Sequence, residues 1–137
     1  MKISEIMTTD VKTTTGTNSI REAAMIMAEI DTGAVLVQEN ERLIGMITDR
    51  DITVRAVAQE LDSNTPVREV MSDNIRYCFD DDEVEVVASN MAGLEMRRLP
   101  VLNSDKRLVG VVSLGNIAAS GDQDSESTLL EGVAKPH

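Results

Sequence analysis

The chain of 137 residues has room for one ordinary domain or for two small repeats that share a core. Its net charge of −11 argues against nucleic acid or an anionic membrane surface as partner, because both need a basic face, but allows a small anion at a local basic cluster. One cysteine excludes an internal disulfide framework, and the first residues lack the apolar run of a signal peptide. No stretch approaches the roughly 20 apolar residues of a membrane span, so a soluble, cytoplasmic protein is expected.

An internal repeat organises the sequence. The segment 3–7, Ile-Ser-Glu-Ile-Met, recurs at 67–71 as Val-Arg-Glu-Val-Met, and Gly45 recurs as Gly110. The offset between the copies grows by one residue along the chain, which places an insertion in the second copy near 95–97. Such a steady offset predicts two copies of one structural unit.

Each copy starts with a short helical turn and a short extended segment, expected at 11–15 and at 75–79. A helix follows, and Ser19 with Glu22 has the spacing of a capping box, as does Asp82 with Glu85. Apolar residues then recur at helical spacing on one face of each helix: Ile20, Ala23, Ala24, Met27 and Ala28 in the first copy, and Val84, Val87, Ala88 and Met91 in the second.

Two strands and a last helix complete each copy. The strands are expected at 34–37 and 43–48, then at 99–102 and 108–113. The last helix is expected at 52–61, with an apolar stripe, and at 116–120; the stripe is Val54, Val57, Ala58 and Leu61.

The predicted fold is therefore α/β (α+β), with two tandem β-α-β-β-α repeats at 1–62 and 63–120. The repeats are expected to pack through their sheets with pseudo-twofold symmetry, because neither alone buries enough apolar surface. The tail, 121–137, is polar and predicted to be disordered.

The first copy closes on Gly45-Met46-Ile47-Thr48-Asp49-Arg50-Asp51, a strand that ends at a hydroxyl and a carboxylate three residues later at a helix start. This arrangement suits a sugar hydroxyl and an anion, since the carboxylate accepts hydrogen bonds and helix-end N–H groups attract negative charge. The same residues also suit helix capping, and the two roles are compatible.

With Arg97-Arg98-Leu99-Pro100-Val101 in the second copy, residues 1–120 resemble a tandem CBS-domain pair, the Bateman module. The resemblance implies a non-enzymatic sensor that requires no cofactor and binds an adenosine-containing ligand in clefts between the repeats. AMP, ADP or ATP is expected ahead of S-adenosylmethionine or NAD. It also implies a disc-like homodimer.

By the same resemblance, the first cleft uses Thr48 and Asp51 for the ribose, and Arg97 and Arg98 suit ligand phosphates. The other copy completes this cleft with Ile75, Tyr77, Leu99 and Pro100. The second cleft would use Ser113, Asn116, Val11, Thr13, Gly33, Ala34 and Val35. Because Asn116 replaces the carboxylate, the second cleft is expected to be weaker or empty.

Other interpretations stay open. The chain could be an interaction or dimerisation module with vestigial clefts and Met-rich helices that dock a partner. Arg97 and Arg98 could be solvated charges, and the acidic run at 80–83 is read as a solvated helix start, since it lacks calcium-loop spacing. Cys78 is read as a buried strand residue. An enzyme has no support, because no nucleophile–base pair or metal constellation is visible and the one histidine, His137, is terminal.

Overall fold

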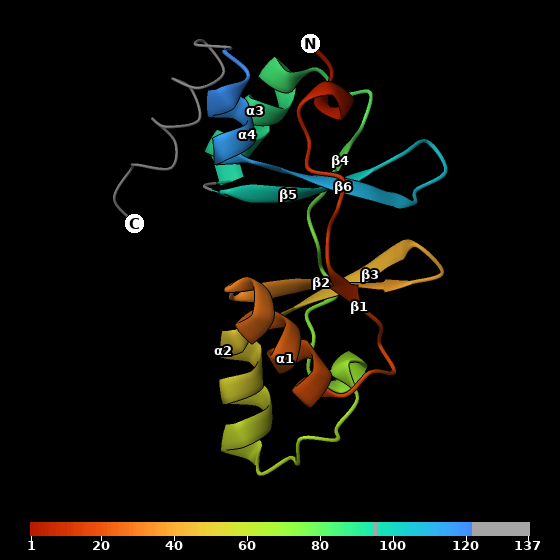
Figure 1. The fold of residues 1–137 in the computed structure, drawn as a ribbon, viewed down its shortest axis with the longest axis vertical. Helices are drawn as coiled ribbons and strands as arrows, with labels where there is room; N and C mark the ends of the chain where they lie inside the picture. Colours follow the sequence, from red (N-terminus) through yellow and green to blue (C-terminus); the bar gives the residue numbers. More distant parts are fainter. Residues whose placement is uncertain (95, 122–137) are drawn as a thin grey trace. The chain divides into compact units, whose positions relative to one another are not determined.

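The computed structural model describes residues 1–94 and 96–121 (Figure 1). The expected disordered tail lies outside the described residues from 122 on, as does Glu95 at the predicted insertion. The chain divides into two compact units. One, the β1–β3 unit, is Lys12–Ile75; the other, the β4–β6 unit, joins Met1–Val11 to the described residues from Arg76 on.

The β1–β3 unit contains a three-stranded sheet in the order β1-β2-β3, with β1 parallel to β2 and β3 antiparallel to it. Helix α1 and the helical segment from Asp49 lie on one face of this sheet (Figure 1). The elements are β1 (Thr13–Thr14), α1 (Ile20–Ile30), β2 (Ala34–Glu39), β3 (Arg42–Thr48), α2 (Asp49–Asp51), the π-helical turn η2 (Ile52–Ala56), and the 3₁₀ turns η3 (Val57–Gln59) and η4 (Val67–Glu69).

The β4–β6 unit repeats this topology in the order β4-β5-β6, which confirms the predicted β-α-β-β-α copies. Helices α3 and α4 pack on the sheet through buried Val87, Met91 and Ile117. No helix among the described residues is both long and apolar enough to span a membrane. The elements are the 3₁₀ turn η1 (Ile3–Glu5), β4 (Cys78–Phe79), α3 (Val84–Leu94), β5 (Arg98–Leu102), β6 (Leu108–Ser113) and α4 (Leu114–Ala119).

The two copies exchange their leading segments. Ile3 of the first copy is fully buried in the core of the β4–β6 unit, and Thr8 exchanges two backbone hydrogen bonds of 2.9 Å with Val111. Val67 of the second copy is fully buried in the core of the β1–β3 unit. The repeat boundary predicted at 62/63 describes the duplicated sequence, whereas the compact units change at residues 11/12 and 75/76.

The predicted helix at 52–61 is wrong in its form. The helical segment starts at Asp49 and passes through the π-helical turn Ile52–Ala56 before ending in a 3₁₀ turn. A π turn holds an extra residue and rotates the residues after it, so a stripe at a 3.6-residue period no longer faces the core. Accordingly Ala56 is buried, whereas the members of the predicted stripe, Val54, Val57, Ala58 and Leu61, are exposed.

Other expectations hold in outline. The capping box of α1 is confirmed, because Glu22 N donates to Ser19 Oγ and Ser19 N donates to Glu22 Oε2, both at 3.2 Å. On this helix Ile20, Ala23 and Met27 are buried, but Ala24 and Ala28 are exposed and lie off the core face. The first strand of each copy has only two residues, fewer than predicted, because each pairs with its neighbour over two positions.

The leading segment of the β4–β6 unit is also held by charge, which gives a pH prediction. Lys2 Nζ lies 2.9 Å from Glu83 Oε1, and the hydrogen bond from Lys2 lowers the pKa of Glu83 below the usual 4.5. Because the folded-state pKa is lowered, this contribution to stability is present above the unfolded-state value and lost as the pH falls through the folded one. We expect the melting temperature of the wild type to fall more steeply with acidification below about pH 4.5 than that of Glu83→Gln. Parallel curves for the two proteins would contradict this.

Candidate functional site

The Thr48–Asp51 motif forms a reciprocal cap at the end of β3. Asp51 N donates to Thr48 Oγ1 and Thr48 N donates to Asp51 Oδ2, both at 3.0 Å. The helix-capping interpretation is therefore confirmed. The cap engages only one carboxylate oxygen; the other, Oδ1, accepts no hydrogen bond from the described residues and has Arg55 Nε 3.8 Å away. Among the described residues, one anionic oxygen and the Thr48 hydroxyl proton thus have no hydrogen-bond partner, and 13% of the Asp51 side chain is exposed.

The Ser113–Asn116 motif has the same cap, but its hydroxyl and amide groups are hydrogen-bonded to other residues of the β4–β6 unit. Asn116 N donates to Ser113 Oγ at 3.1 Å and Ser113 N donates to Asn116 Oδ1 at 2.8 Å. The Ser113 hydroxyl also donates to Asn116 Oδ1 at 2.9 Å, and Asn116 Nδ2 donates to Thr8 Oγ1 at 3.4 Å. This motif therefore lacks both a charge and an unused hydroxyl proton.

In the β4–β6 unit, Arg97 and Arg98 are exposed and lie at the start of β5, beside the Ser113 motif. Arg98 is paired with Ser113 in the sheet, and Arg97 O accepts from Leu114 N at 3.0 Å. Leu99 and Pro100 are buried. Tyr77 is 43% exposed and stacks edge to face on Phe79, with ring centroids 5.6 Å apart.

In the β1–β3 unit, Gly33 and Ala34 lie beside the Thr48 motif. Ala34 is paired with Thr48, and Asp49 N donates to Gly33 O at 2.9 Å. Of the remaining predicted residues, Thr13 lies in β1 and Val35 is buried in β2. Val11 is the last residue of the leading segment of the β4–β6 unit, and Ile75 is the last residue of the β1–β3 unit. Each predicted cleft draws residues from both units, and these combinations stay predictions.

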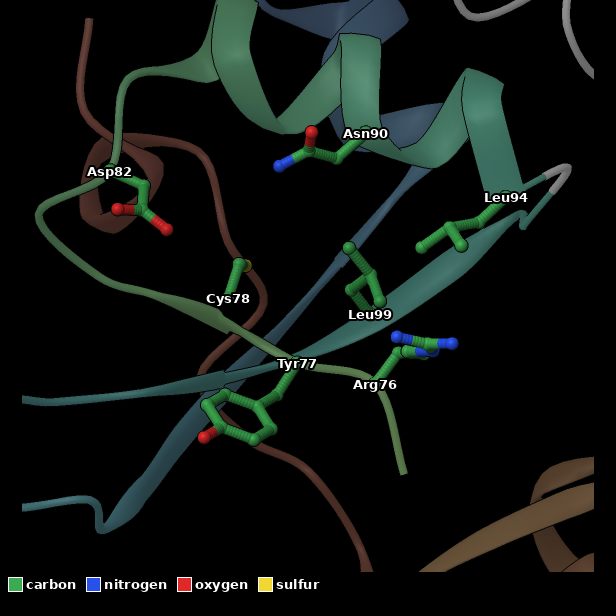
Figure 2. A pocket seen from close by; sticks show the side chains of 7 residues that line it. All are labelled: Arg76, Tyr77, Cys78, Asp82, Asn90, Leu94 and Leu99. Carbon is green, nitrogen blue, oxygen red and sulfur yellow. The ribbon is translucent and has the colours of Figure 1, made fainter. Parts of the chain in front are cut away.

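A pocket of about 330 Å³ lies in the β4–β6 unit, where Asn90 and Leu94 of α3 face the chain that enters β4 (Figure 2). It combines apolar and polar side chains, as small-molecule sites do. Tyr77 and Leu99 were predicted as ligand residues, whereas Arg76 and Asn90 were missed. The lining residues are Arg76, Tyr77, Cys78, Asp82, Asn90, Leu94 and Leu99.

Cys78 lines this pocket as a buried residue of β4, which confirms its predicted place. Its thiol donates to Pro100 O at 3.8 Å. Burial raises the pKa of the Cys78 thiol to about 12, and the nearby Asp82 carboxylate adds to the shift. The thiol is therefore protonated at neutral pH and is not a nucleophile. Asp82 itself accepts from Phe79 N at 2.9 Å, so this part of the acidic run holds the turn before α3.

The CBS domain family model matches residues 3–57 and 67–120, once for each sequence repeat. The chain belongs to the CBS domain family. This confirms the predicted tandem CBS pair, and relatives of similar length carry the same pair. The CBS domain-containing protein YhcV of Bacillus subtilis (strain 168) is 40% identical over 133 residues, which is 96% of this chain and 94% of YhcV.

Two solved CBS structures resemble this chain and contain adenosine compounds. CBS domain protein PAE2072 from Pyrobaculum aerophilum, complexed with AMP, is 30% identical with a TM-score of 0.70, over 85% of this chain and 89% of that one. The CBS domain pair of protein MJ0100, in complex with 5′-methylthioadenosine and S-adenosyl-L-methionine, is 27% identical with a TM-score of 0.69, over 88% and 94%.

Proposed function

We propose that this CBS pair is a regulatory sensor that binds an adenosine-containing ligand of the AMP, ADP or ATP class, without catalysing a reaction. The observation that carries the proposal is that the helix cap uses only one of the two oxygens of the Asp51 carboxylate. Its Oδ2 accepts the capping hydrogen bond from Thr48 N, while Oδ1 can accept hydrogen bonds from the ribose hydroxyls. The Thr48 hydroxyl, which accepts from Asp51 N, can still donate to the sugar or the phosphate. The adenosine compounds bound by the related PAE2072 and MJ0100 proteins support the same ligand class.

Within the β4–β6 unit, side chains also suit the base and the phosphate of an adenosine nucleotide. Leu94 and Leu99 give the pocket of the β4–β6 unit an apolar wall, and the Asn90 amide offers a donor and an acceptor of the kind that an adenine edge needs. Arg97 and Arg98 are exposed, and guanidinium groups match phosphate geometry. A bound nucleotide would act as a signal by its different affinity for two arrangements of the protein.

Calorimetric titration of the full chain with AMP, ADP and ATP tests the proposal. Adenosine, which lacks the phosphate, is the control for the phosphate, and GMP, which carries guanine, is the control for the base. We expect saturable heat for at least one adenine nucleotide and weaker binding of GMP. The bound nucleotide should also raise stability by about 2.7 kcal/mol at 100 times its dissociation constant. A folded protein that gives no heat with any adenosine compound would exclude this function.

A second candidate function is that of an interaction or homodimerisation module with vestigial clefts. It is favoured by the exposed apolar side chains after α2, since Val57 is 67% exposed and Val54 and Leu61 are also exposed. A melting temperature that no adenosine compound changes would favour it. A concentration-dependent mass in sedimentation that Val57→Ser abolishes would add direct support.

A further inference from the structure

Arg55 joins the proposed ribose-binding carboxylate to a distant backbone segment of the β1–β3 unit. Its Nε lies 3.8 Å from Asp51 Oδ1. Its guanidinium also donates to Val70 O at 3.4 Å and to Met71 O at 3.3 Å. The proposed function uses Asp51 but assigns no role to Arg55.

The segment that Arg55 holds returns to the strand that carries the motif. Ser72, the next residue, exchanges two backbone hydrogen bonds of 2.9 Å with Met46 of β3. Met46 lies two residues before Thr48, and Val70 is fully buried. Contacts therefore run in a closed ring from Asp51 through Arg55 and segment 70–72 to β3, and back to Thr48.

The second copy gives an internal comparison. At the repeat offset that relates Gly45 to Gly110, Asp51 corresponds to Asn116 and Arg55 to Ser120. The guanidinium is thus replaced in the copy that lacks the carboxylate. In that copy the amide of Asn116 contacts Thr8, the counterpart of Ser72, directly. The two residues differ together between the copies, as expected if Arg55 serves the Asp51 carboxylate.

We propose that Arg55 is a positioning residue that holds the Asp51 carboxylate in place and couples ligand binding at this carboxylate to the stability of segment 70–72. The inference rests on the proposed function, because it concerns how Asp51 meets its ligand. A carboxylate held in place before binding loses less conformational freedom when the ligand arrives, so affinity rises. By linkage, a ligand that fixes Asp51 must in turn stabilise the Arg55 contacts and the pairing of Ser72 with Met46.

The test combines AMP titration with amide hydrogen exchange of Ser72, whose N–H is bonded to Met46 O. We expect AMP to slow this exchange in the wild type. Arg55→Gln should weaken AMP binding about fivefold, the scale of a partly exposed ion pair, and remove the protection of Ser72. Arg55→Lys keeps the charge but has a single nitrogen, which cannot lie beside Asp51 Oδ1 and donate to the carbonyls of Val70 and Met71 at once, so it should restore part of the affinity without the protection.

Arg50→Gln is the matched control, because it removes the same charge from the same helical segment and Arg50 is exposed with no side-chain contact to Asp51 among the described residues. It should behave as the wild type. If the wild type binds AMP and Arg55→Gln shows unchanged affinity and Ser72 protection, the inference is overturned and the proposed function stands. If the wild type binds no adenine nucleotide, both are overturned. Should Arg55→Gln fail to fold, Arg55→Lys decides, since retention of full Ser72 protection would contradict the coupling.

Discussion

Asp51→Ala is expected to weaken AMP binding by about 30-fold or more, as measured by calorimetry. Hydrogen bonds to a charged group contribute about 1.5–3 kcal/mol each, and the ribose would lose such a bond to Oδ1. Asn116→Ala should weaken binding by less than about threefold, because Asn116 is neutral and its amide already contacts Ser113 and Thr8.

Asp51→Ala also removes one half of the reciprocal cap, the hydrogen bond from Thr48 N to Asp51 Oδ2, which costs about 1 kcal/mol of stability, so folding must be checked by circular dichroism. Asp51→Asn separates the two roles, since an amide oxygen can still accept from Thr48 N while the charge is gone. It should keep most of the stability and still lose affinity. If Asn116→Ala weakened binding more than Asp51→Ala, the roles of the two motifs would be reversed.

Gly45→Ala is expected to lower the free energy of unfolding by about 3 kcal/mol, the scale of forcing extra atoms into a packed core. A Cβ atom at position 45 would lie 2.6 Å from Met71 Sδ and 2.7 Å from Ser72 O. The sulfur can move, but the carbonyl belongs to the segment paired with Met46, so that pairing must shift. Urea unfolding monitored by circular dichroism measures the loss.

Gly93→Ala is the matched control, because Gly93 lies in α3 and a Cβ there meets nothing within 4 Å. Alanine in an exposed helix should stabilise the protein by about 0.5–1 kcal/mol. Gly110→Ala should resemble Gly45→Ala, since its Cβ would lie 2.7 Å from Thr8 O. Wild-type stability in both Gly45→Ala and Gly110→Ala would show that the exchanged segments do not pack on these strands.

The order of the elements could be predicted because local patterns specify it. Alternating and helical apolar periods and a repeated closing motif each depend on near neighbours in the chain. The exchange of leading segments depends instead on distant backbone pairs such as Thr8 with Val111, which no local pattern reports. The recurrence of glycine at 45 and 110 was a signal for this exchange, because the missing side chain leaves room at both positions for the backbone of the exchanged segment. The π turn at Ile52–Ala56 was invisible to a search for a 3.6-residue period.

The candidate site could be predicted only in part. Thr48 and Asp51 were found because a cap and a ribose motif require the same residue types at the same spacing. Arg55 was missed although its spacing of four residues from Asp51 was a signal for an ion pair; its other partners, Val70 O and Met71 O, are backbone atoms and leave no trace in side-chain identity. Asn90 was missed because a polar residue on an exposed helix face is ordinary, and only the packing of α3 on the sheet places it at a pocket.

The most direct test of Asp51 as the ribose-binding residue is the titration of ¹⁵N-labelled protein with AMP, followed through its backbone amide resonances. A ligand at the Asp51 carboxylate changes the acceptor of the Thr48 amide, and a ligand at the Thr48 hydroxyl changes the acceptor of the Asp51 amide, so a ligand that engages both side chains shifts both signals. We expect both to move along one saturable curve with a common dissociation constant. Saturation of the protein by AMP with both signals unmoved would place the ligand elsewhere and contradict the assignment.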